Sequence, residues 1–366
     1  MPPKLWTCSL RRWLLANRPI AYQHTPPSTV ATFTTLTERQ NANHVMPILS
    51  AERSNGTSED ISEEELYRYT RNRWIFNESV QMSERYLKFD LQELLKAAVT
   101  SVSSEGARYC TRVFKCREGL NNKAYLLTMD NGSEVFAKLP SPIAGPAYYT
   151  TASEVATREF LRGVLNIPTP RIVAWSADRN NNVGAEYILE EKAPGKPLGS
   201  LWYQWPMDFK LEMISQIVEI ERQLASTKFV RSGCIYFRED IPDNMCCDNA
   251  ILTSGPLDSS VLDRFQLGPL VSSGLWRGVR ASMDLNRGPY NGQLEFVEAM
   301  ATNEIRFIET HARPRKNYHR SSTETELPDE VLDLLNRYLQ LASAMVPPSG
   351  TDDTDFANAL ASRPPS

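Results

Sequence analysis

The chain has 366 residues, of which 41% are hydrophobic and 23% charged, and its formal net charge is -4. This length and composition are sufficient for a sizeable core in one large or two ordinary domains. A negative charge without a strongly basic domain argues against nucleic acid as the main partner. No apolar run approaches the roughly 18 residues that span a bilayer, so we expect no transmembrane segment.

Residues 1–37 have the composition of a mitochondrial targeting segment. They carry Lys4, Arg11, Arg12 and Arg18 and many Ser and Thr, and no acidic residue occurs before Glu38. Basic, hydroxyl-rich and acid-poor N-termini are typical of import signals. We therefore predict a mitochondrial protein, with the matrix as its destination. An ordinary frayed N-terminus is the alternative.

Residues 38–61 are polar and lack periodicity, which predicts a disordered linker. Order is expected from Ser62, because Ser62 and Glu65 have the spacing of a helix capping box. Asp90 and Glu93 have the same spacing before an apolar helical face. Two helices are therefore expected to precede the sheet.

The periodicity then changes to that of strands. Five strands are predicted, at residues 109–116, 123–129, 133–139, 171–176 and 186–190. Asn131 and Gly132 separate the second strand from the third, and this pair tolerates the positive φ angles of a tight hairpin turn. The second and third strands are therefore expected to be antiparallel neighbours.

The loop between the first two strands contains Gly119, Asn121 and Asn122. A short loop with one Gly and two Asn can turn its backbone amides toward an anion, as phosphate-binding loops do. An ordinary hairpin turn has the same composition. The loop therefore indicates a phosphate site only in combination with other residues.

Lys138 and Glu154 supply that combination. Lys138 ends the third predicted strand, where its side chain could reach the phosphates of a nucleotide. Glu154 opens a predicted helix and could hold Lys138 from there. Two alternatives remain: Thr151 and Glu154 also match a capping box, and Lys138 could be a solvated strand end. The order of glycine loop, lysine and helix glutamate favours the nucleotide site.

Several segments then carry a family resemblance. They are residues 67–74, 136–140, 142–146, 149–157, 167–176, 183–188 and 287–290. In these segments the chain resembles fungal mitochondrial proteins of the aminoglycoside phosphotransferase family. The resemblance implies an α+β, protein-kinase-like fold of two lobes. A five-stranded antiparallel small lobe would occupy residues 62–192, and a mostly helical, truncated large lobe would occupy residues 193–345.

The same resemblance implies an ATP site. Its residues would be Gly119, Asn121, Asn122, Lys138, Glu154, Glu191 and Ala193. The loop residues would lie over the phosphates, the lysine would bind them, and the helix glutamate would pair with the lysine. The segment from Glu191 to Ala193 would face the adenine ring.

The large lobe is expected to consist of helices packed into a core. Three apolar stripes at helical spacing predict them. The first comprises Leu211, Ile214, Ile217, Val218 and Leu224, the second Phe296, Met300, Ile305 and Ile308, and the third Val331, Leu334, Leu335, Tyr338 and Leu341.

The resemblance ends where the family has its catalytic loop. Asp353 and Asn358 have the spacing of the family's His-x-Asp-x-x-x-x-Asn loop, but Thr351 stands where the His is expected. Residues 346–366 are better interpreted as an acidic, disordered tail. We therefore predict no catalytic residue and no metal site, with Mg²⁺ bound weakly if at all.

Three functions remain open. The first is a mitochondrial, kinase-like protein that binds a nucleotide but is catalytically incomplete. The second is an active small-molecule phosphotransferase whose catalytic C-terminal part is missing from this chain. The third is a non-catalytic mitochondrial scaffold or structural relic, with apolar helices left partly uncovered. The partners would be a nucleotide and a small molecule or protein that the sequence does not identify.

Overall fold

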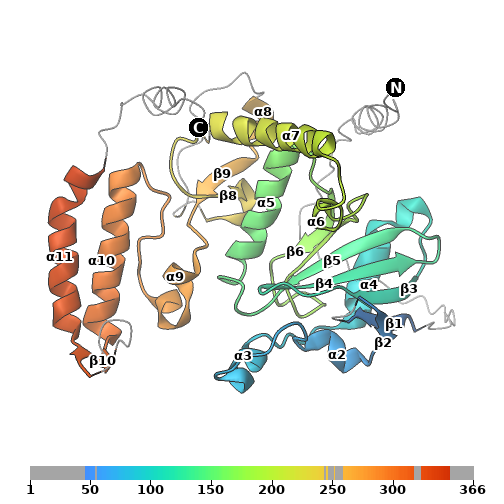
Figure 1. Cartoon of the computed structure of the whole chain (residues 1–366), viewed down its shortest axis with the longest axis horizontal. Helices are drawn as coiled ribbons and strands as arrows, with labels where there is room; N and C mark the ends of the chain where they lie inside the picture. The colour runs from blue at the N-terminus through green and yellow to red at the C-terminus, as the bar shows by residue number, and fades with distance from the viewer. Residues whose placement is uncertain are drawn as a thin grey trace, which may run out of the picture. The chain divides into compact units, whose positions relative to one another are not determined.

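The computed structural model describes residues 46–53, 56–242, 245, 251, 259–316 and 323–346. These residues form an α+β fold built on a mixed seven-stranded sheet (Figure 1). The predictions for residues 1–37 lie outside the described part, as do those for the tail beyond Val346. The kinase-like, two-lobed arrangement stays a prediction.

The strands of the sheet follow the order β2-β1-β3-β4-β5-β7-β6. They are β1 Ile48–Glu52, β2 Ser58–Asp60, β3 Cys110–Lys115, β4 Asn122–Met129, β5 Glu134–Pro140, β6 Ile172–Ser176 and β7 Tyr187–Glu191. From β3 to β6 every pair of neighbours is antiparallel. These are the five strands expected from the sequence, and no strand end differs from its expected position by more than one residue.

The expected count of five strands was wrong, because the sheet continues through β1 and β2. Both lie in the segment predicted to be a disordered linker. β1 runs parallel to β3, with Ile48 opposite Arg112 and Ala51 opposite Lys115, and β2 pairs with β1 in antiparallel fashion. Pairing with β3 satisfies backbone groups that would otherwise form an open sheet edge. Long-range pairing therefore orders residues that have no periodicity of their own.

The hairpin between β4 and β5 is as predicted. Gly132 has φ +84°, and its amide donates to the carbonyl of Met129 at 3.0 Å. A residue with a side chain would be strained at that φ angle. The turn fixes the register that places Ala124 opposite Lys138.

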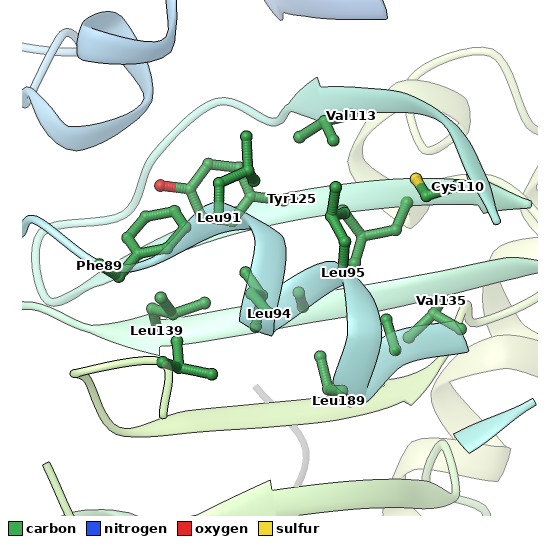
Figure 2. Packing of buried hydrophobic residues seen from close by; sticks show 14 of the residues in the cluster. Phe89, Leu91, Leu94, Leu95, Cys110, Val113, Tyr125, Val135, Leu139 and Leu189 are labelled. Atoms are coloured by element: carbon green, nitrogen blue, oxygen red, sulfur yellow. The ribbon is translucent and has the colours of Figure 1, made fainter. Parts of the chain in front are cut away.

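One face of the sheet is covered by α4, which spans Leu91–Ser101. The Asp90 side chain accepts a hydrogen bond from the Glu93 amide at 3.0 Å and caps this helix. Figure 2 shows Leu91, Leu94 and Leu95 of α4 directed at the strands. They pack on side chains that alternate along the sheet, namely Val113, Tyr125, Leu127, Val135, Leu139 and Leu189. Burial of each such side chain contributes about 1.5–3 kcal/mol.

The short helices α2 Glu63–Tyr67 and α3 Glu78–Glu84 precede α4, so three helices come before β3 where two were expected. The predicted capping box at Ser62 is confirmed, because the Glu65 carboxylate accepts a hydrogen bond from the Ser62 amide at 3.1 Å. The buried Tyr125 hydroxyl donates to the Leu66 carbonyl at 2.8 Å. This bond ties α2 to the core.

The opposite face of the sheet receives α5, which spans Tyr149–Gly163. Its Val155, Ala156 and Phe160 pack against Ile172 and Ile188 of the sheet. The same cluster includes side chains of a second, two-stranded sheet formed by β8 Cys234–Phe237 and β9 Phe265–Gly268. Contacts with two sheets fix the position of α5, and with it the position of Glu154.

The other helices and one more pair of strands lie in the helical region, residues 198–345. They are α6 Leu198–Leu201, α7 Met207–Ser226, α8 Ser259–Leu262, α9 Ser273–Trp276, α10 Gln293–His311, α11 Pro328–Met345 and the small pair β10 Arg315–Lys316 and β11 Thr325–Glu326. Short 3-10 turns occur at Ser103–Glu105, Arg238–Asp240 and Gly278–Ser282. The three predicted helices are present as α7, α10 and α11.

Core packing of these three helices was predicted, and for α7 this prediction was wrong. None of its side chains is buried, and Leu211 and Val218 remain 55% and 53% exposed. In α11 only Ala342 is buried. The apolar period correctly predicted the helices, but burial requires a neighbouring element to cover the stripe.

Candidate functional site

Lys138 lies on the sheet face that carries α5. Along β5 the buried Val135, Ala137 and Leu139 belong to the cluster under α4, so Phe136 and Lys138 are directed to the opposite face. The cross-strand partners of Lys138 are Ala124 and Ile188. Ile188 packs in the cluster around α5, which confirms this orientation.

The structure brings Lys138 and Glu154 together. The Lys138 Nζ lies 2.5 Å from the Glu154 Oε1, and the two side chains are 22% and 28% exposed. The pair is therefore half-buried, and neither side chain is closed off from solvent. Lys138 is consequently not a free, solvated strand end.

The capping-box alternative for Glu154 was wrong, and so was the expectation that Glu154 opens its helix. α5 begins at Tyr149, with Tyr148 as its N-cap residue, so Glu154 lies in the second turn. The Thr151 hydroxyl donates to the buried Glu186 at 2.6 Å instead of capping a helix. Glu154 is therefore free of an N-terminal capping role.

Arg158 extends the pair toward β7, a contact that the sequence analysis missed. It lies one turn after Glu154 on α5, with its Nη1 3.9 Å from the Glu154 Oε1. It also forms a close ion pair with the buried Glu190 of β7. The spacing of four residues between Glu154 and Arg158 was the available signal. Because Arg158 carries its own carboxylate partner, Glu154 remains available to Lys138.

The loop between β3 and β4 returns to the sheet beside the end of β5. The Asn121 carbonyl accepts hydrogen bonds from the Ser141 amide at 2.8 Å and from its hydroxyl at 2.9 Å. Asn122 is already the first residue of β4, opposite Pro140. Gly119 and Asn121 are exposed. The structure thus places the tip of this loop at the end of the strand that carries Lys138.

A buried ionic cluster lies at the base of this loop, and the sequence analysis missed it. It consists of Lys115, Glu118 and Lys123, whose side chains are at most 2% exposed. The Glu118 Oε1 lies 2.8 Å from the Lys123 Nζ and 3.3 Å from the Lys115 Nζ. Buried charges are costly unless they are paired and hydrogen-bonded.

Residues 65–71 supply the remaining partners of this cluster. Lys115 and Lys123 donate to the Arg68 carbonyl at 2.6 and 2.9 Å, and Lys115 also donates to the Glu65 carbonyl at 2.8 Å. The Glu118 Oε2 accepts from the Thr70 amide at 2.8 Å. Arg71 donates to the Glu118 carbonyl at 2.8 Å. The loop is therefore bound to the segment that follows α2.

Burial changes the acidity of both lysines. Loss of solvation lowers the pKa of Lys115 to about 8, although Glu118 opposes this change. The same cause lowers the pKa of Lys123. The charges of this cluster lie on the α4 side of the sheet, because Lys115 pairs with Tyr125 across β3 and β4. Lys138 lies on the other side.

Glu191 and Ala193 do not join Lys138 in any contact that the described residues show. Glu191 ends β7, its amide donates to the Arg171 carbonyl at 2.9 Å, and its carboxylate lies 2.7 Å from the Arg171 Nε. Ala193 is exposed in the following segment. Their predicted position against an adenine ring stays a prediction.

Metal-binding groups and reactive thiols are two other features that could form a site in the described part of the chain. Among the residues described, no group of three or more His, Cys, Asp or Glu side chains is placed to hold a metal ion. Cys110, Cys116 and Cys234 are free thiols. Burial raises the pKa of Cys110 and of Cys116 to about 11, so these thiols have little nucleophilic character.

The chain is similar to two groups of fungal proteins. It is 32% identical over 271 residues to a subtelomeric hrmA-associated cluster protein of Aspergillus fumigatus, covering 66% of this chain and 51% of that protein. It is 25% identical over 248 residues to altered inheritance of mitochondria protein 9 of Candida tropicalis, covering 58% of this chain and 40% of that protein. For the protein of that name in Yarrowia lipolytica the identity is 23%, with 66% and 44% covered.

These similarities confirm the resemblance to fungal mitochondrial proteins, and specifically to altered inheritance of mitochondria protein 9. No protein-family model matches the chain. The relatives' names refer to no phosphotransferase, so the kinase-like assignment stays a prediction. The chain spans about half the length of the curated relatives that it matches. None of the helices in the described ranges has the length and apolar character needed to cross a membrane.

Proposed function

We propose that this chain is a mitochondrial, kinase-like protein that binds a nucleoside triphosphate such as ATP on the α5 side of its sheet. The observation that carries the proposal is the half-buried pair of Lys138 and Glu154. The loop that contains Gly119 is attached to the end of the same strand through Asn121 and Ser141. A lysine held by a carboxylate, at the edge of a short loop, is a suitable point charge for phosphate groups. The mitochondrial relatives support the location.

The sheet supports a kinase-like lobe through its topology. Strands β3, β4, β5, β7 and β6 form five antiparallel neighbours, and α5 follows the strand that ends near Lys138. This is the order of elements that the resemblance implies for the small lobe. The additional strands β1 and β2 extend the sheet at its far edge and leave this arrangement unchanged.

The face around Lys138 also offers an apolar surface for a base. Ala124, Leu126 and Phe136 alternate onto this face and are half-buried. Partly exposed apolar side chains next to a few charged groups are typical of ligand sites. A base packed there would lie on the same side of the sheet as the lysine that binds its phosphates.

The proposal is confined to binding. The catalytic loop of the family was not recognised in the sequence, and the described residues contain no metal cluster. We therefore propose that ATP binds with little dependence on Mg²⁺. The second candidate is an active phosphotransferase. The length of the relatives, about twice the part they share with this chain, favours it.

Titration of the purified chain with ATP, followed by calorimetry, tests the proposal. Lys138→Ala should weaken binding at least about tenfold, because it removes a charge-assisted contact. Lys96→Ala is the control: Lys96 pairs with Glu93 at 3.5 Å on α4, which covers the opposite face of the sheet, and it is 71% exposed. Equal affinities of wild type and Lys138→Ala, or no ATP binding by the wild type, would refute the proposal.

Repeating the titration without Mg²⁺ tests the proposal that ATP binding depends little on the metal. We expect affinities within about threefold of each other, since no described side chains are placed to hold the metal. A much tighter complex with Mg²⁺ would show that metal ligands exist elsewhere in the chain. Phosphoryl transfer that disappears in Lys138→Ala would favour the enzyme instead.

A further inference from the structure

The base of the loop at residues 116–121 is fixed by charges, whereas its tip is open. Lys115, Glu118 and Lys123 are buried below it, and Leu120 at the tip is 56% exposed. A loop whose backbone must approach phosphates requires a defined position, because misplacement of binding groups weakens a complex. The buried cluster is the feature that defines this position.

We propose that Glu118 is a positioning residue that holds the loop over the phosphates of the nucleotide, and that residues 65–71 form the support against which it is held. The inference rests on the proposed function. Glu118 does not face the ligand itself, because its carboxylate is enclosed by Lys115, Lys123 and Thr70 on the α4 side. It acts through the backbone of the next residue, Gly119.

The connections of Glu118 make this assignment specific. Its carboxylate contacts two strands, since Lys115 ends β3 and Lys123 lies at the start of β4. The same carboxylate binds the Thr70 amide, and the Glu118 carbonyl accepts from Arg71. One side chain therefore connects both ends of the loop with a third segment. Apolar residues could fill this space, but they would supply no such directional contacts, and a neutral amide would supply them without the charge.

The second anchor of the loop is independent of this cluster. The Asn121 carbonyl is bound by Ser141 at the end of β5. Loss of the Glu118 contacts should therefore release residues 117–120 while β4 and β5 keep their register. This local effect distinguishes positioning from general stabilisation of the fold.

The test compares ATP and adenosine as ligands of wild type, Glu118→Gln and Arg71→Ala. Arg71 is exposed and contacts only the loop carbonyl in the bonds described, so its removal should not unfold the protein. Arg73→Ala is the control, because Arg73 lies two residues away and pairs with Glu78 at 2.7 Å. Hydrogen exchange of the amides at 117–122 is measured on the same four proteins.

We expect both loop variants to bind ATP about tenfold more weakly and adenosine within about twofold of the wild type. Exchange at residues 117–120 should accelerate in both, and Arg73→Ala should match the wild type throughout. A variant that is merely destabilised would lose both ligands together. The difference between ATP and adenosine therefore reports the position of the loop.

Two results would overturn the inference. If the wild type binds ATP and both loop variants bind it equally well, Glu118 does not position the loop, whereas the proposed function stands. If the wild type binds no ATP, the proposed function fails and this inference fails with it. If Glu118→Gln does not fold, the affinities of Arg71→Ala for ATP and adenosine decide whether the loop is positioned in this way.

Discussion

Apolar side chains recur at regular spacing in the sheet region, up to Glu191, and in the helical region, residues 198–345. The two regions differ in whether these side chains are buried. In the sheet region the alternation along β4 and β5 ends in a continuous core with α4 (Figure 2). In the helical region α7 has a regular apolar stripe and buries none of it. Periodicity thus determines which face of an element is apolar, and the neighbouring elements determine whether that face is buried.

The largest change in the free energy of unfolding should come from substitution of a charge that is buried in the sheet region. Glu118→Ala leaves two buried lysines without their carboxylate, so we expect a loss of about 3–5 kcal/mol in the free energy of unfolding. Glu134→Ala removes the half-buried partner of the exposed Lys192 and should cost less than about 1 kcal/mol. Urea denaturation measures both. Equal losses would contradict a buried cluster.

Substitution of a core leucine should cause the next largest loss in the free energy of unfolding. Leu94 is 1% exposed in α4, whereas Leu334 is 66% exposed in α11. Leu94→Ala should lower the free energy of unfolding by about 3 kcal/mol through lost burial and a cavity. Leu334→Ala should change it by less than about 0.5 kcal/mol. A large loss for Leu334→Ala in the same denaturation experiment would show that α11 is covered in solution.

A smaller effect should depend on pH. Burial lowers the pKa of Lys115 to about 8 in the folded protein, below its ordinary value of 10.5. Between these values the unfolded chain binds more protons, so the contribution of Lys115 to the free energy of unfolding rises with pH. Its cost is complete below about pH 8 and is relieved as the pH approaches about 10.5.

Comparison of wild type with Lys115→Met isolates this contribution. The difference in free energy of unfolding, wild type minus variant, should increase from about pH 7.5 to about pH 9.5. Lys96→Met is the control, because Lys96 on α4 is 71% exposed, and its difference should stay flat. A flat difference for Lys115→Met would mean that the lysine is solvated.

The smallest change in the free energy of unfolding is expected for a substitution on α7. Val218 is 53% exposed, so Val218→Lys should change the free energy of unfolding by less than about 0.5 kcal/mol. A loss comparable to that of Leu94→Ala would reveal an element that covers α7 and would remove the difference between the two regions. Thermal denaturation at two protein concentrations would show whether that element belongs to a second copy.

The sequence predicted what local patterns encode. The five central strands followed from their periodicity, and the hairpin followed from Asn131 and Gly132. The contact between Lys138 and Glu154 followed from the order of the elements. Strands β1 and β2 could not be predicted, since β1 depends on pairing with β3 across about 60 residues of chain.

The buried cluster was missed for a different physical reason. Alternation along β4 directs Lys123 toward α4, but a lysine at a strand end ordinarily indicates a solvated position. Its burial depends on Glu118 and on the Arg68 carbonyl, which are brought there only by the folded chain. Likewise, the exposure of α7 depends on what lies against it, and a helical stripe contains no information about that.

Strand β1 sets a limit on proteolytic trimming. Its pairing with β3 begins at Ile48, so a protease that cuts before this residue leaves all described pairs of the sheet in place. Cleavage after Asp60 would instead uncover the backbone of β3 from Arg112 to Lys115. A shortened protein of that kind would present a bare strand to other chains and should self-associate.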